Sequence, residues 1–477
     1  MPEDTETPRE RPRVVILGGG PAGVGAAYQL RRHDRADVTL VERNPVFGGN
    51  AGSFVANGQH LDYGSHRLHS ACDPRILEDI RRLLKGDLAH RVRHGRIRLR
   101  GKWLHFPLKP VDLLLRLDKT FAAGAAWDMA RRALPRGENA GDTFASVLRA
   151  NLGATICEHF YFPYARKIWG REPEELSGIQ ARKRVTAGTF RKLVRRLAKP
   201  PGAGKFHYPR RGYGQISDGY AEAATEAGAD LWLGWRATGL IEPEAGAGRW
   251  RVQAEGPDGE SRTVEADHLW STIPVTIAAR MISPEPPAEV IDAIGRIRYR
   301  AMVLVYLELG VDRFSSTDAH YFPESHIAMT RLSEPKNYYG VAEPVGRTTL
   351  CAELPCAVGD DTWNMSDEDL GRWVAEDMAR AGLPLPSPPL SAFSRRLPQA
   401  YPVYLQGYEE PLGVVDEWVS TRPGFLSYGR QGLFAHDNTH HALYMAYAAV
   451  ECLGERGFDH EKWTAFREIF STHVVED

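Results

Sequence analysis

The chain has 477 residues, a formal net charge of −1, 43% apolar residues and 25% charged residues. This length favours two or three domains, and the near-neutral charge argues against nucleic acid as a partner. The five cysteines are odd in number and indicate a reducing compartment rather than a disulfide framework. No apolar stretch is long enough to span a bilayer. Because residues 1–11 are polar, we expect a disordered leader and a cytoplasmic protein.

Regular elements can be predicted in chain order from the spacing of apolar residues. The first three are a strand, a helix and a strand, at Arg13–Leu17, Pro21–Arg32 and Asp37–Glu42. Further helices are expected at Pro110–Leu134, Met365–Leu383 and Thr439–Gly454, and further strands at Leu231–Glu242, Trp250–Ala254, Ser261–Thr272 and Ala301–Leu309. Because strands and helices mix throughout, the predicted class is α/β or α+β.

A glycine-rich loop, Gly18-Gly19-Gly20-Pro21-Ala22-Gly23, joins the first strand to the first helix. Gly18 permits a tight turn, Gly20 lets the backbone approach a pyrophosphate, and Gly23 lets the helix pack closely on the strand. The start of the helix offers free N–H groups to phosphates. Glu42 lies 19 residues after Gly23, where an acid holds both ribose hydroxyls and disfavours a 2′-phosphate. The pattern predicts a Rossmann-type dinucleotide site.

A second glycine segment follows directly. Arg43 precedes the pair Gly48-Gly49, which is followed by Asn50, Gly52 and Ser53. Alone, this run is typical of an ordinary surface turn. Joined to the first loop, it resembles the extended fingerprint of the FAD-binding amine oxidase superfamily, in which the second glycine pair lets the chain pass close to the cofactor. The resemblance implies FAD rather than NAD.

Later segments resemble UDP-galactopyranose mutases. They are Leu61–His69, Tyr164–Gly170 with Glu175–Ser177, Tyr208–Gln215, Tyr321–Glu324 followed by Arg331, and Gly429–Gly432 with the helix from Thr439. Protoporphyrinogen-oxidase-like proteins share the fold and several of these segments. The resemblance runs from about Arg13 to Leu453. It implies a discontinuous FAD-binding domain of residues 12–72, 205–290 and 420–455. The substrate domain, residues 73–204 and 291–419, would contain helices and an antiparallel sheet.

The resemblance also implies which side chains meet the flavin and the substrate. A mutase histidine that lies against the flavin corresponds to His66, and His69 is three residues further on. A buried structural histidine is the alternative for His66. With the two glycine loops, we assign Gly64, Gly429, Arg430, Asp437 and Asn438 to FAD, and Tyr164, Trp169, Tyr321 and Tyr401 to the substrate.

Two arginines are candidate anion clamps. Arg331 matches a mutase arginine that holds the sugar-nucleotide diphosphate, and Arg184 lies near the other. The planar guanidinium suits phosphate oxygens. The stretch Arg182–Arg211 has eleven Lys or Arg and no acid, which favours an anionic substrate. A solvated helix face, or a basic patch that rests on a membrane surface, is the alternative for this stretch.

Histidines also gather near the C-terminus. His436, His440 and His441 suggest a metal, because residues four apart on a helix share a face. No third ligand type or known metal spacing accompanies them, so we expect no metal. Asp437 and Asn438 fit a helix cap that faces the flavin better. His436 stands where mutases carry a tyrosine on the diphosphate, so it is a catalytic candidate along with His66, His69, Arg184 and Arg331.

Three functions fit these observations. The first is an FAD-dependent oxidoreductase that removes a hydride from an anionic, nucleotide-linked or glycosidic small molecule, and we rank it first. The second, implied by the mutase resemblance, is a sugar-nucleotide mutase that uses reduced flavin as a nucleophile, and His436 counts against it. The third is a non-catalytic flavin-binding scaffold. The expected partner is a small anionic substrate, with no nucleic acid and no integral membrane contact, and a homodimer is one oligomeric state we consider.

Overall fold

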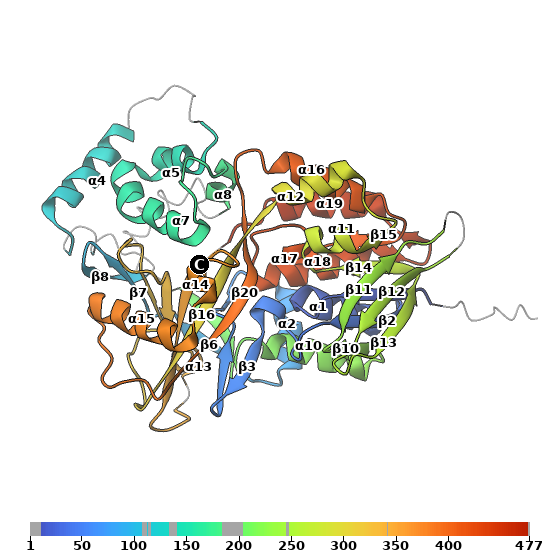
Figure 1. Ribbon diagram of the computed structural model, residues 1–477, viewed down its shortest axis with the longest axis horizontal. Coiled ribbons are helices and arrows are strands. Elements are labelled where there is room, and N and C mark those ends of the chain that lie inside the picture. Colours follow the sequence, from blue (N-terminus) through green and yellow to red (C-terminus); the bar gives the residue numbers. More distant parts are fainter. Residues whose placement is uncertain are drawn as a thin grey trace, which may run out of the picture.

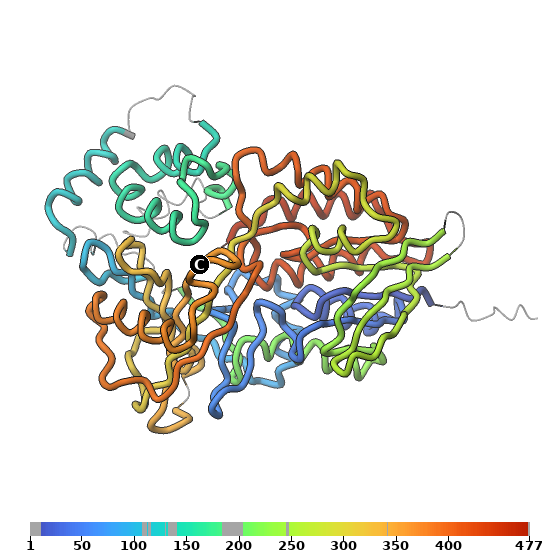
Figure 2. Tube along the Cα trace, in the orientation of Figure 1, coloured from blue at the N-terminus to red at the C-terminus, as the bar shows by residue number. Residues whose placement is uncertain are grey.

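The computed structural model describes residues 11–106, 112, 116–132, 141–183, 204–244, 248–340 and 342–475. A five-stranded parallel sheet forms one half of the molecule, in the order β10 (Asp230–Leu233), β2 (Asp37–Glu42), β1 (Arg13–Leu17), β14 (His268–Ser271) and β21 (Phe425–Ser427). Figure 2 shows that these strands come from the blue, green and red parts of the chain, which lie side by side. The sheet is therefore assembled from segments that are far apart in sequence.

Both faces of this sheet are covered, which explains its continuous apolar strands. Val14 and Ile16 face one core, with the helices α1 (Pro21–Arg32), α10 (Gln215–Glu226) and α18 (Thr439–Cys452). Val15 and Leu17 face the other core. That core is closed by α11 (Val275–Met281), α12 (Ala288–Arg296), α16 (Glu409–Ser420) and a sheet of β13 (Ser261–Ala266), β12 (Trp250–Glu255), β11 (Arg236–Ile241) and β15 (Ile282–Ser283).

A seven-stranded sheet forms the other half (Figure 1). Its order is β20 (Ser391–Val403), β16 (Arg298–Leu309), β19 (Thr348–Cys356), β18 (Arg331–Ser333), β17 (Ala319–Tyr321), β7 (Gly95–Leu99) and β8 (Lys102–Phe106). All neighbours are antiparallel except β17 and β7. The helix α15 (Asp367–Arg380) packs Leu370, Val374 and Met378 onto the apolar side chains of β16.

A helical unit lies above this sheet in Figure 1. It contains α4 (Lys119–Arg132), α5 (Phe144–Leu152), α6 (Ala154–Ile156), the π-helix Cys157–Tyr161, α7 (Phe162–Trp169) and α8 (Gly178–Arg182). Lys167 of α7 joins the unit to the sheet, because its ammonium donates to the carbonyls of Phe322, Glu324 and Met329. The loop between β17 and β18 is therefore held by the side chain of Lys167.

Smaller elements complete the fold. They are a 3₁₀ turn at Gly49–Ala51, the hairpin β3 (Ser53–Ala56) and β4 (Gln59–Asp62), the sheet of β5 (Leu68–His69), β9 (Lys205–Pro209) and β6 (Leu88–Val92), the helices α2 (Pro74–Leu83), α13 (Lys336–Tyr339), α14 (Asp361–Asn364), α17 (Gly429–Gly432) and α19 (His460–Ser471), and the hairpin β22 (Leu453–Gly454) and β23 (Gly457–Phe458). Among the helices of the described residues, none combines the length and the apolar composition that a membrane-spanning segment needs.

The mixed α/β class is confirmed, and the first strand, helix and strand have the predicted bounds. The strands of the parallel sheet all come from the segments assigned to the FAD domain, and those of the seven-stranded sheet from the substrate segments. The exact domain boundaries stay a prediction. The helix α2 packs in the core of the parallel sheet although it follows residue 72, and α19 packs on α18 beyond residue 455.

Candidate active site

A cavity of about 620 Å³, the central cavity, lies where the two halves meet. Its floor is the carboxyl end of the parallel sheet: Leu17 ends β1, Glu42 ends β2, and Thr272 directly follows β14. Its roof includes Met302, Arg331 and Glu353 of the seven-stranded sheet. Parallel sheets bind ligands outside the carboxyl ends of their strands, so this location favours a cofactor site.

The first glycine loop is shaped for a ligand that approaches the backbone. Gly18 has φ +97°, and a Cβ on Gly23 would lie 1.9 Å from the carbonyl oxygen of Gly18. A Cβ on Gly20 would meet nothing within 4 Å, because Gly20 borders the open cavity. The helix α1 begins directly after Gly20 without a side-chain cap, and its first N–H groups are available to a phosphate.

Glu42 fixes this loop from the next strand. Its carboxylate accepts the Gly19 N–H at 2.6 Å and the backbone N–H of Asn44 at 2.7 Å, and the side chain is buried. The carboxylate also lines the central cavity beside Arg43. Glu42 therefore has the position from which an acid reaches a ribose, and its contact with the ribose stays a prediction.

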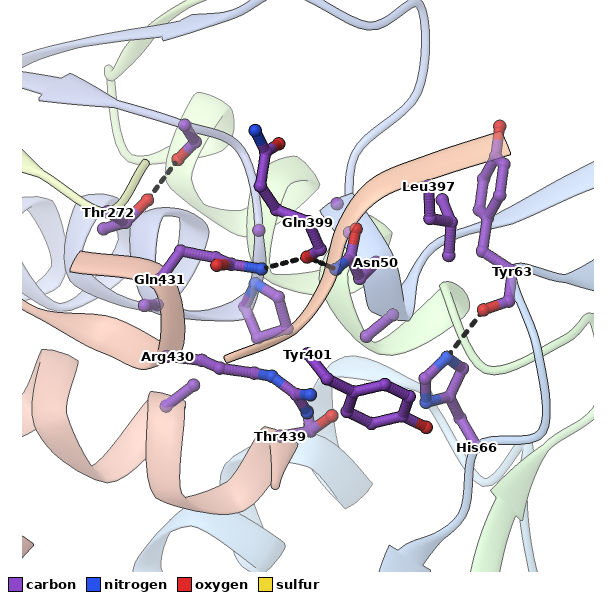
Figure 3. Close-up of a pocket in the computed structure, with 18 of the residues that line it drawn as sticks. Asn50, Tyr63, His66, Thr272, Leu397, Gln399, Tyr401, Arg430, Gln431 and Thr439 are labelled. Atoms are coloured by element: carbon purple, nitrogen blue, oxygen red, sulfur yellow. Dashed lines mark hydrogen bonds between the residues drawn. The ribbon is translucent and has the colours of Figure 1, made fainter. Parts of the chain in front are cut away.

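The second glycine segment is tied to the first. Gly48 has φ +102° and donates its N–H to the carbonyl of Gly19 at 2.8 Å. Figure 3 shows that the carbonyl of Gln399 accepts hydrogen bonds from the side chains of Asn50, at 3.1 Å, and Gln431, at 2.8 Å. One carbonyl of β20 thus joins the N-terminal and C-terminal segments around the cavity.

The C-terminal segment closes the same wall. Gly429 has φ +80°, and a Cβ there would lie 2.8 Å from the Ala22 side chain. Arg430 donates to the carbonyls of Asp437, at 2.9 Å, and Ala400, at 3.0 Å. Asn438 is the N-cap of α18, as predicted. Two glycine loops, an uncapped helix start and a polar wall fit a flavin dinucleotide.

His66 is brought into the cavity by the segment after β4. Its Nε2–H donates to the carbonyl of Tyr63 at 2.9 Å, so Nδ1 carries the lone pair (Figure 3). Burial lowers the pKa of His66 to about 4, which keeps the ring neutral near pH 7. The ring stacks on Tyr213 with centroids 5.5 Å apart. His69 also lines the cavity, and its ring lies 6.4 Å from that of His440.

A row of cross-strand neighbours brings three polar side chains to one face of the seven-stranded sheet. Tyr321 pairs with Arg331 in register, and Arg331 pairs with Glu353. The guanidinium of Arg331 binds both oxygens of Glu353, at 2.9 Å from Nε and 2.8 Å from Nη2. Glu353 also accepts the Ser65 N–H at 2.9 Å. The predicted clamp Arg331 is therefore a neutralised, oriented guanidinium rather than an isolated charge.

The remaining predicted substrate residues separate into two groups. Tyr401 and Tyr164 line the central cavity, and the ring of Tyr401 lies 5.4 Å from His436. Tyr321 is buried in the row just described. Trp169 lies in the core of the helical unit, 5.3 Å from the ring of Phe144, and does not line the cavity. We correct the expectation of a substrate contact for Trp169, because α7 turns it toward α5. Arg184 lies outside the described residues.

Asp437 joins a cluster that the sequence did not show. His473, near the C-terminus, binds its Oδ2 through Nδ1 at 2.8 Å, and the rings of His441 and His473 stack 4.2 Å apart. The ligand atoms of these three residues lie within 4.8 Å of one another, which is close enough for a metal. The ammonium of Lys183, 4.0 Å from Asp437, supplies a positive charge there already. Burial tends to raise the pKa of Asp437, but His473, His441 and Lys183 lower it overall.

Three features of the site were missed by the sequence analysis. Glu353 and Gln399 lie in strands and hold the cavity wall, and Arg67 sits in a segment singled out only for its histidines. An acid inside the otherwise apolar run Cys351–Cys356 was the available signal for Glu353, since unpaired charges are rarely buried. Gln399 holds the wall through its backbone carbonyl, which accepts from Asn50 and Gln431. A contact made by the backbone leaves no signal in the sequence.

The chain is similar to known flavoproteins. The family described as flavin containing amine oxidoreductase matches residues 21–446. The chloroplastic protoporphyrinogen oxidase of Oryza sativa subsp. japonica is 22% identical over 463 residues, covering 89% of this chain and 83% of the relative. The coproporphyrinogen III oxidase of Bacillus subtilis (strain 168) is 22% identical over 447 residues, covering 87% and 93%.

A crystal structure of reduced UDP-galactopyranose mutase has the same fold, with a TM-score of 0.80 and 21% identity, covering 98% of this chain and 100% of the mutase. The family match spans most of the chain. The glycine loops, the start of α1 and the polar wall of the cavity fit the flavin that the description of this family names. The protein belongs to the flavin-containing amine oxidoreductases and is an FAD-dependent enzyme of that family.

Proposed function

We propose that this enzyme removes a hydride from an anionic, nucleotide-linked or glycosidic small molecule. The observation that carries the proposal is the charge of the central cavity, which is lined by eight arginines and three carboxylates. The arginines are Arg43, Arg67, Arg93, Arg236, Arg331, Arg395, Arg396 and Arg430, and the carboxylates are Glu42, Glu353 and Asp437. A cavity whose lining has an excess of one sign of charge concentrates ligands of the opposite sign.

The FAD pyrophosphate accounts for part of this charge, but not for the arginines of the seven-stranded sheet. The first glycine loop and the start of α1 follow β1 of the parallel sheet, whereas Arg331 belongs to β18 of the seven-stranded sheet. We therefore assign the loops to FAD, and Arg331, Tyr401 and Tyr164 to the substrate. Tyrosine rings offer a stacking face and a phenol to a sugar or a base.

When bound, FAD supplies an acceptor for hydride. The residues of this chain orient the reacting groups. Neutral His66 presents Nδ1 as a hydrogen-bond acceptor, and its Nε2–H is held by Tyr63. Arg430 lies over the ring of Tyr401 at 5.4 Å and limits the positions that this ring can take. We propose that His66 and Tyr401 orient the substrate, with His436 behind Tyr401 and His69 further along the wall.

The test is oxygen consumption by the purified, oxidised holoprotein. Pairs of small molecules that differ only in a phosphate or carboxylate would be supplied: a sugar phosphate with its parent sugar, and an amino acid with its amide. We expect turnover with an anionic member and little with its neutral partner. Turnover of neutral amines alone would contradict the anionic substrate class.

Two further expectations from the sequence are proposals here. The five cysteines are all unpaired and buried, which supports a reducing compartment such as the cytoplasm. A homodimer stays a prediction, which the mass of the purified holoprotein in solution would test. The mutase alternative is separated from hydride removal by the flavin state that each reaction requires.

A further inference from the structure

Arg67 occupies an unusual position in the wall of the central cavity. It follows His66 and precedes β5, and its guanidinium carbon lies over two rings, 5.4 Å from the centre of Phe206 and 4.9 Å from that of Tyr338. Phe206 belongs to β9 and Tyr338 to α13. These rings contact the cation but accept no conventional hydrogen bond from it.

The donors of Arg67 are largely unused. Nη1 reaches the hydroxyl of Tyr321 at 3.4 Å, whereas Nε and Nη2 are buried and have no acceptor among the described residues. Asp318 acts on Arg67 from beyond ion-pair distance, and its carboxylate accepts the His94 N–H at 2.7 Å. Because arginine keeps its charge in proteins, a buried guanidinium without acceptors is costly unless a bound group supplies them.

The comparison with Arg331 shows what is missing. Arg331 has two contacts to Glu353, and Tyr321 lies between the two arginines, with its hydroxyl toward Arg67 and its ring 5.9 Å from Arg331. Two guanidinium groups therefore face this end of the cavity, and among the described residues one carboxylate, Glu353, forms an ion pair with them, through Arg331. One positive charge is left over, and it is on Arg67.

We propose that Arg67 is the binding site for an anionic oxygen group, a phosphate or a carboxylate, on the substrate. This inference rests on the proposed function and makes it more specific. The planar guanidinium of Arg67 binds the anion, and Tyr321 lies beside that guanidinium. Arg331, which is held by Glu353, forms the border of the site. Arg67 is thus a specificity-determining residue, and Arg331 is not the main anion clamp.

The experiment measures binding to the oxidised holoprotein by calorimetry, without turnover. The probes are UDP against uridine for a phosphate, and 3-phenylpropionate against 3-phenylpropanamide for a carboxylate. We expect the parent protein to prefer at least one anion over its neutral partner by about tenfold to a hundredfold. The probe pair that shows the preference identifies the anion. Arg67→Met should abolish the preference, and the control Arg372→Met, on the exposed face of α15, should retain it.

Arg67→Lys keeps the charge but loses the fork, so it should retain part of the preference. This variant also serves if Arg67→Met does not fold, which FAD content and thermal unfolding would reveal. The inference is overturned if the parent shows no anion preference, if Arg67→Met or Arg67→Lys matches the parent, or if Arg372→Met loses the preference as well. Anion binding at Arg67 without any oxidation would leave this inference standing and contradict only the proposed function.

Discussion

Replacing Glu353 by glutamine is expected to destabilise the enzyme strongly. The carboxylate is 3% exposed and accepts three hydrogen bonds, two from Arg331 and one from the Ser65 N–H. The substitution keeps the volume but leaves the guanidinium of Arg331 buried without its counter-charge. Removing one partner of a buried ion pair typically costs about 3–5 kcal/mol, and the remaining amide oxygen should place the loss toward the lower end of that range.

The assay is urea unfolding of the holoprotein, with the circular dichroism and the release of flavin followed together. The matched control is Glu368→Gln, because Glu368 pairs with Arg372 on the exposed face of α15 and its side chain is 88% exposed. Exposed pairs of this kind contribute little, so the control should unfold like the parent. Equal midpoints for Glu353→Gln and Glu368→Gln would refute the role given to Glu353.

Three other predictions concern the cofactor loop and two buried bases. Gly20→Ala should fold normally, because φ is −71° and a Cβ would meet nothing within 4 Å, but FAD binding should weaken by about 1–3 kcal/mol. Gly413→Ala, also in open space, is the control and should keep its FAD in equilibrium dialysis. Burial lowers the pKa of Lys167 to about 7 in the folded protein, whereas an unfolded lysine has a pKa of about 10.4. Between about pH 7 and about 10.4 the unfolded state therefore binds more protons than the folded state, so the free energy of unfolding should rise with pH across this window. Lys167→Met should flatten that rise in thermal unfolding, and an equal rise in both proteins would contradict the assignment. Burial lowers the pKa of His66 to about 4, so the pH–rate profiles of the parent and His66→Gln should have the same shape between about pH 5.5 and 8. An inflection found only in the parent would show that His66 titrates there.

The first strand, helix and strand could be predicted to the residue, because their signals are local. Four consecutive apolar residues mark β1, and the glycines mark the turn. The open space at Gly20 and the close approach at Gly23 agree with the roles predicted from spacing alone. Glu42 was likewise found by its distance from Gly23, since strand and helix lengths in such a unit vary little.

The roof of the cavity could not be predicted in this way. Tyr321, Arg331 and Glu353 are neighbours only because β17, β18 and β19 pair in register. Which strands pair cannot be deduced from the local periodicity of the sequence. Arg331 was found by resemblance, but the carboxylate that neutralises it was not. Trp169 was misassigned for the same reason: its motif indicated a functional segment, while the direction of the side chain depends on how α7 packs against α5.

The central claim is that the enzyme removes a hydride from an anionic substrate. The most direct measurement mixes the oxidised holoprotein with the anionic compound that supports oxygen consumption, under strict exclusion of oxygen, and records the visible flavin spectrum. The claim predicts that the yellow colour is lost with one equivalent of substrate, without any added reductant. A spectrum that stays oxidised, together with isomerisation of the same compound only by dithionite-reduced protein, would contradict the claim and establish the mutase alternative.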